Sequence, residues 1–364
     1  MSTLYIEGTN APPEIKKALR ELSKNIAFTK EDVKAANGYV FFGTNRITEK
    51  SLAVKFYYWG GKAEFHAEPK QLAQIEADNV LKIQDAALLD NRWAYFVTPN
   101  CANGDLDELL ETTSLGNMAA IDYTYQILSG LSHLHSKQFL HRDIKPANIY
   151  ISDDNKAVIG DFGSVKKIPE GATSIPASSH SLLYRPPESI TKNSYGIEGD
   201  IYQAGIVLYQ LAGGALPYDG REWLSRRELE HYESIILPDD QSEFVDQCIR
   251  SQIVVGKVLN LSSLPPWVPQ TLKRLIRKAC HVDSAQRFAN SSSFMAKLHE
   301  LRPSILDWRV VDGAPILFGK TSYRIVERED VHCVQKRTTG DWRNDNGFSG
   351  ASIEELVDEI SKKA

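Results

Sequence analysis

The spacing of hydrophobic residues divides the chain into a strand-like first part and a helical second part. Residues 38–58 and 79–98 are rich in Val, Phe and Tyr and alternate between apolar and polar positions, which predicts paired strands. After Asn103-Gly104 the apolar residues recur at helical spacing instead. Helices are predicted over three later segments, 119–135, 200–212 and 270–300.

Two further helices are predicted before this change of pattern. Pro12-Pro13-Glu14 opens an amphipathic segment whose apolar residues lie near one face, at Ile15, Leu19, Leu22 and Ile26. Residues 63–77 also have helical character, and Pro69 either kinks this helix or delays its start. The second of these helices lies between the two strand-like segments.

The pattern changes once more beyond Arg302-Pro303, where the last long helix ends. Short strands are predicted over four apolar segments, 308–311, 314–318, 322–326 and 331–334. A terminal helix over 351–362 follows, with Ser352 as its cap and Glu355 three residues later. Residues 306–364 are too rich in Val, Ile, Phe and Trp for a disordered tail, so we expect a small β/α module. It either docks a partner or caps the preceding helices.

Composition narrows the class of protein. The 364 residues carry a net charge of -5, which argues against a general nucleic-acid or membrane-surface binder. The four cysteines are scattered and form no Cys-x-x-Cys pair, so neither a zinc site nor a disulfide framework is predicted. No basic segment followed by an apolar core begins the chain, and no apolar run approaches the roughly 20 residues of a spanning helix. We therefore expect a cytoplasmic protein with no membrane or nucleic-acid partner.

The chemistry is concentrated in two motifs. The run HRDIKPAN occupies residues 141–148, and DFG follows at 161–163. Phosphoryl transfer from a nucleotide needs a group that orients the attacking hydroxyl, and Asp143 fits this need. It also needs oxygen ligands for magnesium, which Asn148 and Asp161 supply.

These two motifs, in this order, resemble the catalytic core of the eukaryotic-like (Hanks-type) serine/threonine protein kinase family. The resemblance implies an α+β fold of two lobes, one rich in strands and one helical. It also implies ATP and Mg²⁺ as cofactors, with Mn²⁺ as an alternative, and a protein substrate phosphorylated on Ser or Thr. The resemblance covers roughly residues 33–300.

The resemblance extends to several side chains around the motifs. Lys55 matches the strand lysine that contacts the α- and β-phosphates, and Glu68 matches its ion-pair partner, with Glu64 as the competitor. Lys145 is characteristic of the serine/threonine branch, where it touches the transferring phosphate. His141 matches a structural histidine.

The nucleotide-binding segments match less completely. In the glycine loop that covers the phosphates, only Gly38 and Val40 fit the family pattern, whereas Val33 and Ala35 replace glycines. Four later residues are expected to border the adenine and ribose: Thr98 at the back pocket, Pro99 and Cys101 at the adenine edge, and Asp105 at the ribose. For Asp105, a role as a helix cap is an equal alternative.

The segment from Asp161 to Glu188 resembles a kinase activation segment. Ser181 falls where the family places a threonine that bonds the catalytic aspartate and lysine, and Arg142 matches a receiver of a phosphorylated side chain. Candidate phosphorylation sites are Thr173, Ser174, Ser178 and Ser179. Two scaffold contacts are also expected, a pair between Glu188 and Arg287 and a brace from Asp200 to the catalytic-loop backbone.

These matches predict an N-terminal extension (1–30), a kinase domain (31–302) and a C-terminal module (306–364). The small lobe would span about 31–98 and the large lobe about 104–302. We expect an ATP- and magnesium-dependent serine/threonine kinase, possible docking of a partner on the module, and activation by phosphorylation. Because the glycine loop is degraded, a pseudokinase scaffold remains the alternative, and a small-molecule kinase is a narrower one.

Overall fold

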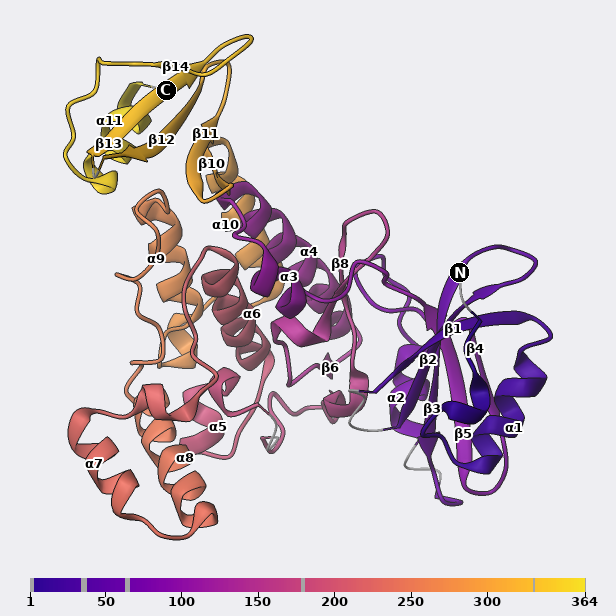
Figure 1. Ribbon diagram of the computed structural model, residues 1–364. Coiled ribbons are helices and arrows are strands. Elements are labelled where there is room, and N and C mark those ends of the chain that lie inside the picture. Colours follow the sequence, from indigo (N-terminus) through magenta and orange to yellow (C-terminus); the bar gives the residue numbers. More distant parts are fainter. Residues whose placement is uncertain (1–2, 34–37, 63–65, 178–180, 330, 364) are drawn as a thin grey trace. The chain divides into compact units, whose positions relative to one another are not determined.

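A computed structural model describes residues 3–33, 38–62, 66–177, 181–329 and 331–363. The chain forms two compact units (Figure 1). The first contains Met1–Leu106 together with Ala147–Val165, and the second contains Asp107–Pro146 together with Lys166–Ala364. The first unit is rich in strands and the second in helices, so the α+β fold expected from the sequence is confirmed.

A five-stranded antiparallel sheet forms the centre of the first unit. In spatial order its strands are β1 (Ile26–Asp32), β2 (Tyr39–Asn45), β3 (Ser51–Tyr58), β5 (Trp93–Pro99) and β4 (Asp85–Leu88). In β3, side chains alternate between faces, so Leu52, Val54 and Phe56 are buried whereas Lys55 is only half-buried. This alternation places Lys55 on the face opposite the main cluster of apolar residues.

The N-terminal segment takes part in this core. Helix α1 (Pro13–Leu22) has two prolines at its start, which suit the first helical turn because they need no intrahelical donor. Its fully buried residues Ile15 and Leu19 pack with Phe41 and Val54 of the sheet. Strand β1 already begins at Ile26, inside the segment that the sequence suggested as an extension.

The hairpin that follows the catalytic loop belongs to the first unit. Strands β7 (Ile149–Ile151) and β8 (Ala157–Ile159) pair antiparallel, and Val80 bridges to Ile159 in parallel. Asn79 donates its side-chain amide to the Ala157 carbonyl at 2.9 Å. The short helix α2 (Ala67–Leu72) contributes Glu68 and ends before residue 77, where the helix predicted over 63–77 was expected to end.

The second unit is built from helices. Their bounds are α3 (Leu106–Thr112), α4 (Asn117–Ser136), α5 (Pro187–Thr191), α6 (Ile197–Leu211), α7 (Arg226–Ser234), α8 (Pro238–Val254), α9 (Gln270–Ala279) and α10 (Ser291–Leu301). Helix α6 is buried from Gly199 to Leu211. A helix that is buried on all sides is mostly apolar around its circumference, and the buried polar side chains of α6, Asp200, Gln203 and Gln210, are hydrogen-bonded. No helix in the described part of the chain is both long and apolar enough to cross a membrane.

The C-terminal residues form a folded module. Five antiparallel strands follow in sequence order: β10 (Asp307–Val311), β11 (Ala314–Phe318), β12 (Ser322–Arg328), β13 (Val331–Arg337) and β14 (Arg343–Asn344). Helix α11 (Ile353–Lys363) completes it, and the Ser352 hydroxyl accepts a hydrogen bond from the Glu355 amide at 3.2 Å. The short strand β14 has no counterpart among the strands predicted from the sequence.

This module packs on the helices of its own unit. The Trp267 and Trp308 rings stack with their centroids 6.4 Å apart. The Asn117 side chain donates to the Trp267 carbonyl at 2.9 Å and to the Leu306 carbonyl at 3.3 Å. A Cβ at Gly116 would lie 2.3 Å from the Trp308 carbonyl oxygen, so only glycine fits there. The module therefore shares a continuous interior with α4.

Candidate active site

Lys55 and Glu68 form an ion pair. The Lys55 Nζ lies 2.9 Å from one carboxylate oxygen of Glu68 and 2.8 Å from the other. The two side chains are 23% and 18% exposed, so the pair is partly shielded from water but still accessible to a ligand. Glu64, the competing partner, lies outside the described residues. Of the two glutamates, Glu68 is therefore the one for which this contact is seen.

Gly38 has a role in the sheet itself. Its φ is 144°, and a Cβ there would lie 2.2 Å from the Phe56 carbonyl oxygen. Close approach of the β3 backbone therefore requires a glycine at this position whether or not a phosphate is bound. Val40 pairs with Lys55 across β2 and β3, and Val33 is 77% exposed. Ala35 lies outside the described residues.

The proposed adenine-edge residues lie at the end of β5. Thr98 is buried and pairs with Ala53, and Pro99 pairs with Leu52. Cys101 follows in a turn, where its carbonyl accepts from the Gly104 amide at 3.1 Å. Burial raises the pKa of the Cys101 thiol to about 11, and the nearby charge of Asp153 acts in the same direction. Cys101 is consequently a protonated thiol near neutral pH.

Asp105 directly precedes α3 and forms an antiparallel bridge with Tyr150. The amide of the neighbouring Ile151 donates to the Gly104 carbonyl at 2.9 Å. The β7 strand that follows Asn148 therefore lies beside the segment that follows the adenine-edge residues. This contact brings the ribose candidate Asp105 into the same unit as the two metal-ligand candidates.

Asn148 and Asp161 lie on neighbouring backbone segments. The Gly160 amide donates to the Asn148 carbonyl at 2.9 Å, and Asn148 is buried. Asp161 adopts a left-handed conformation with a φ of 51°, and its Oδ1 accepts a long hydrogen bond of 3.4 Å from the Gly163 amide. A non-glycine residue in this conformation is strained, and such strain is found most often at functional sites.

The sequence gave no prominence to Tyr150, which lies among these candidates. Burial raises the pKa of its hydroxyl, and the charges of Asp161, Glu68, Asp105 and Cys101 raise it further. A Cβ at Gly160 would lie 2.2 Å from the Tyr150 ring, so the residue before the DFG motif must be glycine. The only sequence signal was its place on the strand that directly follows Asn148.

Gln71 is a second residue that sequence reasoning missed. Its side-chain amide donates to the Val165 carbonyl at 2.9 Å, which links α2 to the segment that follows Asp161. Gln71 lies three residues after Glu68 on the same short helix. This contact joins two distant parts of the chain, so no local pattern could have predicted it.

Another group of the residues predicted to be functional lies in the second unit. Asp143 is only 4% exposed, and its Oδ2 lies 3.1 Å from the Lys145 Nζ. The same Nζ donates to the Ser181 hydroxyl at 2.8 Å. Lys145 therefore bridges the catalytic-loop carboxylate and a hydroxyl of the activation segment. This is the contact that the sequence suggested for Ser181.

Asp200 braces the catalytic loop, as the sequence predicted. One of its carboxylate oxygens accepts from the His141 amide at 2.9 Å, and the other accepts from the Arg142 amide at 2.8 Å. Burial alone would raise the Asp200 pKa, but the hydrogen bond and charge of His135 outweigh it and lower that pKa overall. The buried carboxylate is thus kept ionised and fully hydrogen-bonded, which fixes the backbone around Asp143.

A second side chain of α6 supports the same loop. The Gln203 side-chain oxygen accepts from the Ile144 amide at 2.9 Å, and its nitrogen donates to the Arg142 carbonyl at 3.4 Å. Tyr195 donates to both Asp200 and Gln203 at 2.9 Å. The loop therefore takes its shape from a buried polar network that α6 presents. Arg142 itself has a φ of 73°.

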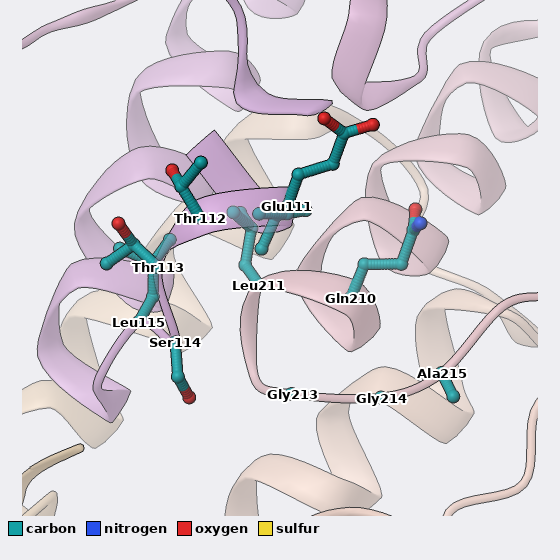
Figure 2. A pocket seen from close by; sticks show the side chains of 11 residues that line it. Glu111, Thr112, Thr113, Ser114, Leu115, Gln210, Leu211, Gly213, Gly214 and Ala215 are labelled. Atoms are coloured by element: carbon teal, nitrogen blue, oxygen red, sulfur yellow. The ribbon is translucent and has the colours of Figure 1, made fainter. Parts of the chain in front are cut away.

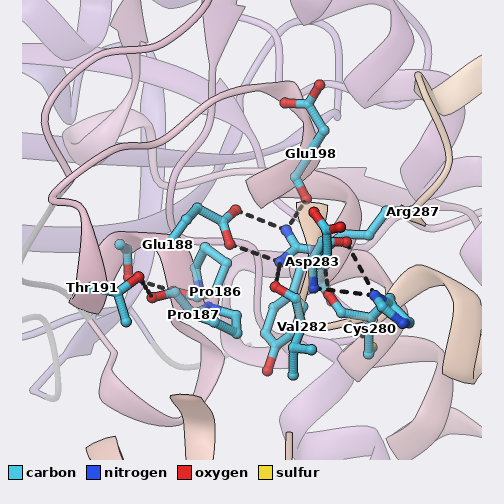
Figure 3. Close-up of polar contacts among 12 residues, drawn as sticks. Pro186, Pro187, Glu188, Thr191, Glu198, Cys280, Val282, Asp283 and Arg287 are labelled. Atoms are coloured by element: carbon cyan, nitrogen blue, oxygen red, sulfur yellow. Dashed lines mark hydrogen bonds and ion pairs between the residues drawn. The ribbon is translucent and has the colours of Figure 1, made fainter. Parts of the chain in front are cut away.

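The end of the activation segment is fixed by the expected pair between Glu188 and Arg287 (Figure 3). Two parallel hydrogen bonds of 2.8 and 2.7 Å join the carboxylate to the guanidinium, whose side chain is fully buried. Arg287 also donates to the carbonyls of Glu198 and His281, and it lies over the Tyr202 ring. All of these contacts are structural.

A separate pocket of about 380 Å³ lies between the ends of α3 and α6 (Figure 2). Its lining includes the side chains of Glu111, Thr112 and Gln210, but none of the motif residues. The Gln210 oxygen accepts from the Tyr184 hydroxyl at 3.0 Å. The pocket wall is therefore tied to the activation segment.

Comparison with known proteins agrees with this geometry. A 3-phosphoinositide-dependent protein kinase B from Dictyostelium discoideum is 32% identical over 182 residues, which cover 48% of this chain and 20% of that protein. The probable serine/threonine-protein kinase PknB of Lactococcus lactis is 26% identical over 64% of this chain. The mitogen-activated protein kinase mpkC of Aspergillus terreus is 29% identical over 89% of this chain.

These matches cover 34% of the length of PknB and 91% of that of mpkC. A tyrosine-protein kinase receptor, svh-2 of Caenorhabditis elegans, is also similar, at 26% identity over 49% of the chain and 17% of its own length. The chain thus spans between 17% and 34% of the length of three relatives that it matches. Residues 34–299 match the family described as the protein kinase domain, so the chain belongs to the protein kinase family.

Proposed function

We propose that this chain is an ATP- and magnesium-dependent protein kinase that phosphorylates serine or threonine. The observation that carries the proposal is the position of Lys145 between the Asp143 carboxylate, at 3.1 Å, and the Ser181 hydroxyl, at 2.8 Å. A carboxylate that accepts a hydroxyl proton and a lysine beside it suit transfer of a phosphoryl group to an alcohol.

The nucleotide side of the proposed reaction uses residues of the first unit. Lys55, oriented by Glu68, contacts the phosphates, and the backbone of Pro99 and Cys101 meets the adenine. The Tyr150 ring lies against the backbone just before Asp161, since a Cβ at Gly160 would lie 2.2 Å from it, and we place this ring beside the nucleotide site. Asp105 is the candidate for the ribose contact.

The metal-ligand candidates fit magnesium by their chemistry. Asn148 offers an amide oxygen and Asp161 a carboxylate, and Mg²⁺ prefers such hard oxygen donors. Among the described residues, the Asp161 carboxylate accepts a long hydrogen bond from the Gly163 amide, which leaves lone pairs for a cation. When bound, Mg²⁺ would neutralise charge on the phosphates.

On the acceptor side, Asp143 receives a hydrogen bond from the substrate hydroxyl and turns its oxygen toward the phosphate. It takes the hydroxyl proton as the hydroxyl oxygen bonds to the γ-phosphorus of ATP, while the bond from that phosphorus to the β–γ bridging oxygen breaks and ADP leaves. Lys145 places a positive charge next to the group that is transferred, and Ser181 keeps the lysine in position. Most of the rate enhancement would come from positioning and electrostatic stabilisation.

The test is Asp143→Asn in the full chain, with radiolabelled ATP, Mg²⁺ and a mixture of Ser-, Thr- and Tyr-containing peptides. Because the variant lacks the proton acceptor, turnover should fall by about 10²–10³ while the melting temperature stays unchanged. Asp153→Asn, an equal change at an exposed turn, should keep full activity. Near-normal turnover of Asp143→Asn would refute the assignment, and labelling of tyrosine alone would refute the Ser/Thr specificity.

A second candidate is a pseudokinase scaffold that acts through nucleotide-gated binding. The observation in its favour is Gly38, which the sheet requires for its own packing, so its presence is no evidence of phosphate binding. This candidate predicts that ATP and Mg²⁺ raise the melting temperature, while no labelled peptide or protein is formed. Intact turnover excludes it.

Phosphorylation of the activation segment is proposed as the activating step. One Arg142 nitrogen donates to the Pro176 carbonyl at 3.0 Å, so the arginine lies beside this segment. Thr173 and Ser174 are exposed there, whereas Ser178 and Ser179 lie outside the described residues. A phosphate adds about −1.5 to −2 charge near the guanidinium. Mass spectrometry of active enzyme should find one of these four sites modified, and fully active enzyme without modification would rule out the step.

A further inference from the structure

The C-terminal module carries an unusual group of charges on one face of its sheet. The guanidinium carbons of Arg324 and Arg337 lie 4.6 and 4.5 Å from the centroid of the Trp342 ring. All three side chains are half-buried, so they are accessible to a ligand. We call these three residues the Arg-Trp-Arg cluster.

The strand register explains how this cluster forms. Arg337 pairs with Ser322, two residues before Arg324 on β12, so both arginines project from the same face. The chain then turns through Gly340, whose φ of 68° suits glycine, and brings Trp342 to the edge of the sheet. This face lies opposite the one that buries Tyr323 and Ile325 against α11.

The orientation of Arg324 is fixed by a hydrogen bond to the buried side chain of Gln335. Its Nε donates to the Gln335 side-chain oxygen at 2.7 Å, and the Gln335 nitrogen donates to the Asn344 side chain at 2.8 Å. Gln335 is only 4% exposed. The terminal nitrogens of Arg324 are consequently directed away from this buried amide and are preoriented to donate hydrogen bonds to a ligand.

The two arginines differ from other basic residues of the module in their partners. Arg309 pairs with Asp307 at 2.7 Å, and both Lys336 and Lys363 lie near Asp345, at 3.2 and 3.6 Å. Within the part of the chain that the structure describes, Arg324 and Arg337 share an indole instead of a carboxylate. Two like charges next to one ring repel each other, and an anion bound between them would relieve that repulsion.

We propose that the Arg-Trp-Arg cluster is a docking site for a phosphorylated, acidic segment of a partner protein. Guanidinium groups form parallel hydrogen bonds to phosphate and carboxylate oxygens, which makes such anions the matching ligands. A short phosphorylated protein segment, which needs only a local pair of arginines, suits the charge pattern better than a long nucleic acid or an anionic membrane does. Residues 306–364 contain nine Lys and Arg but eleven Asp and Glu, whereas nucleic acids and anionic membranes select extended clusters of basic residues.

This proposal goes beyond phosphotransfer and can be tested without nucleotide. The probe is a fluorescein-labelled peptide with two phosphoserines flanked by glutamates, titrated with the full chain and followed by fluorescence anisotropy. Arg324→Gln with Arg337→Gln should weaken binding at least about tenfold, because two charge-assisted contacts are lost. The matched control is Arg343→Gln, which the register places on the other face, since Arg343 pairs with Lys336. It should change the dissociation constant less than about twofold, as expected for a rim charge.

Each other result counts against the site. Equal weakening by the double variant and the control would indicate non-specific attraction. No binding of the phosphopeptide at millimolar concentration, or equal binding of its unphosphorylated form, would overturn the proposal. So would tighter, arginine-dependent binding of a single-stranded oligonucleotide or of phosphatidylserine vesicles.

A second measurement does not depend on how the variants fold. Hydrogen exchange of the wild-type chain should slow in β12, β13 and β14 when the phosphopeptide is added, and slowing confined to other elements would contradict the site. The Asp143→Asn chain should bind the peptide normally. If the wild-type chain binds the phosphopeptide but transfers no phosphate, only the proposed kinase activity is refuted, and the docking site is not.

Discussion

The phosphoacceptor and nucleotide sides of the candidate site are built in different ways. Asp143 is positioned by a loop whose backbone is bound to Asp200 and Gln203, which are 0% and 2% exposed. On the nucleotide side, Lys55 is held by an ion pair with Glu68 that is accessible to water and by the Phe96 ring, whose centroid lies 5.7 Å from the Lys55 Nζ. The acceptor geometry therefore forms when the helical core folds, whereas the nucleotide geometry depends on a few separable contacts.

The supporting helices explain this difference. Helix α6, which presents Asp200 and Gln203, is buried over most of its length, so its position is fixed by packing. Helix α2, which presents Glu68, has six residues, of which Pro69 and Leu72 are buried. A helix this short is not stable by itself and depends on tertiary contacts. Loss of one contact should consequently change activity on the nucleotide side and stability on the acceptor side.

The largest effect is expected for Asp200→Ala. Removal of this carboxylate takes away the acceptor of the buried His141 and Arg142 amides, while the Tyr195 hydroxyl retains its bond to Gln203. The free energy of unfolding should therefore fall by about 3–5 kcal/mol, with activity lost as well. Urea denaturation measures this change. The control is Asp122→Ala, which breaks an exposed pair with Arg302 and should cost less than about 1 kcal/mol. Equal stabilities of the two variants would show that the loop does not depend on α6.

Lys55→Met should have the opposite effect, with a large loss of turnover and a small loss of stability. Turnover should fall about 10²-fold because a phosphate contact is lost. The free energy of unfolding should change by only about 1 kcal/mol, since the ion pair is partly exposed. Lys30→Met removes an exposed lysine from β1 of the same sheet and should leave both quantities unchanged. If Lys55→Met destabilises the protein as much as Asp200→Ala does, the two sides of the site are not built differently.

Truncation after Pro303 tests how far the rigid interior of the second unit extends. Without the module, Trp267 loses its stacking partner Trp308, and Asn117 loses one of its two carbonyl partners. The melting temperature should fall by at least about 5 °C, as a loss of roughly 2 kcal/mol predicts for a domain of this size. Trp308→Ala in the full chain should reproduce most of this loss. An unchanged melting temperature in both proteins would show that the module is an independent appendage.

The sequence predicted the parts of the site that carry strong local signals. The motifs at 141–148 and 161–163 marked the segments that we propose to be catalytic, and alternation around Lys55 correctly predicted that it lies on a strand of the sheet. The pairing of Glu188 with Arg287, 99 residues apart, followed from resemblance and not from any local pattern. Tertiary packing determined the rest. The sheet role of Gly38 comes from the approach of another strand.

The same limit applies to the C-terminal module. Its four longer strands and final helix could be predicted from periodicity, because each has a buried face. Strand β14 has only two residues, which is too short for an alternating pattern. The approach of Trp342 to two arginines depends on sheet register, which the sequence alone does not specify.

The smallest effect is expected for Gln71→Leu, which removes the hydrogen bond from α2 to the Val165 carbonyl. Among the described residues, the other end of this amide, Oε1, is buried without a partner, so leucine also removes an unsatisfied atom. Stability should therefore be nearly unchanged. Glu68 is less well positioned, however, so kcat/KM should fall by about 3–10-fold, equivalent to one hydrogen bond of roughly 1 kcal/mol.

The matched control is Gln74→Leu. Gln74 follows the same helix, and its exposed side chain donates to the Lys70 carbonyl of α2 at 3.1 Å. This variant should keep full activity. The measurement compares the apparent affinity for ATP with that for the peptide. Gln71→Leu should weaken the affinity for ATP and leave that for the peptide unchanged, because Glu68 orients Lys55, the proposed contact to the ATP phosphates. Two results would contradict this prediction: an equal loss of activity in both glutamine variants, or a change in peptide affinity alone. Either result would show that the hydrogen bond between α2 and Val165 does not position the Lys55–Glu68 pair.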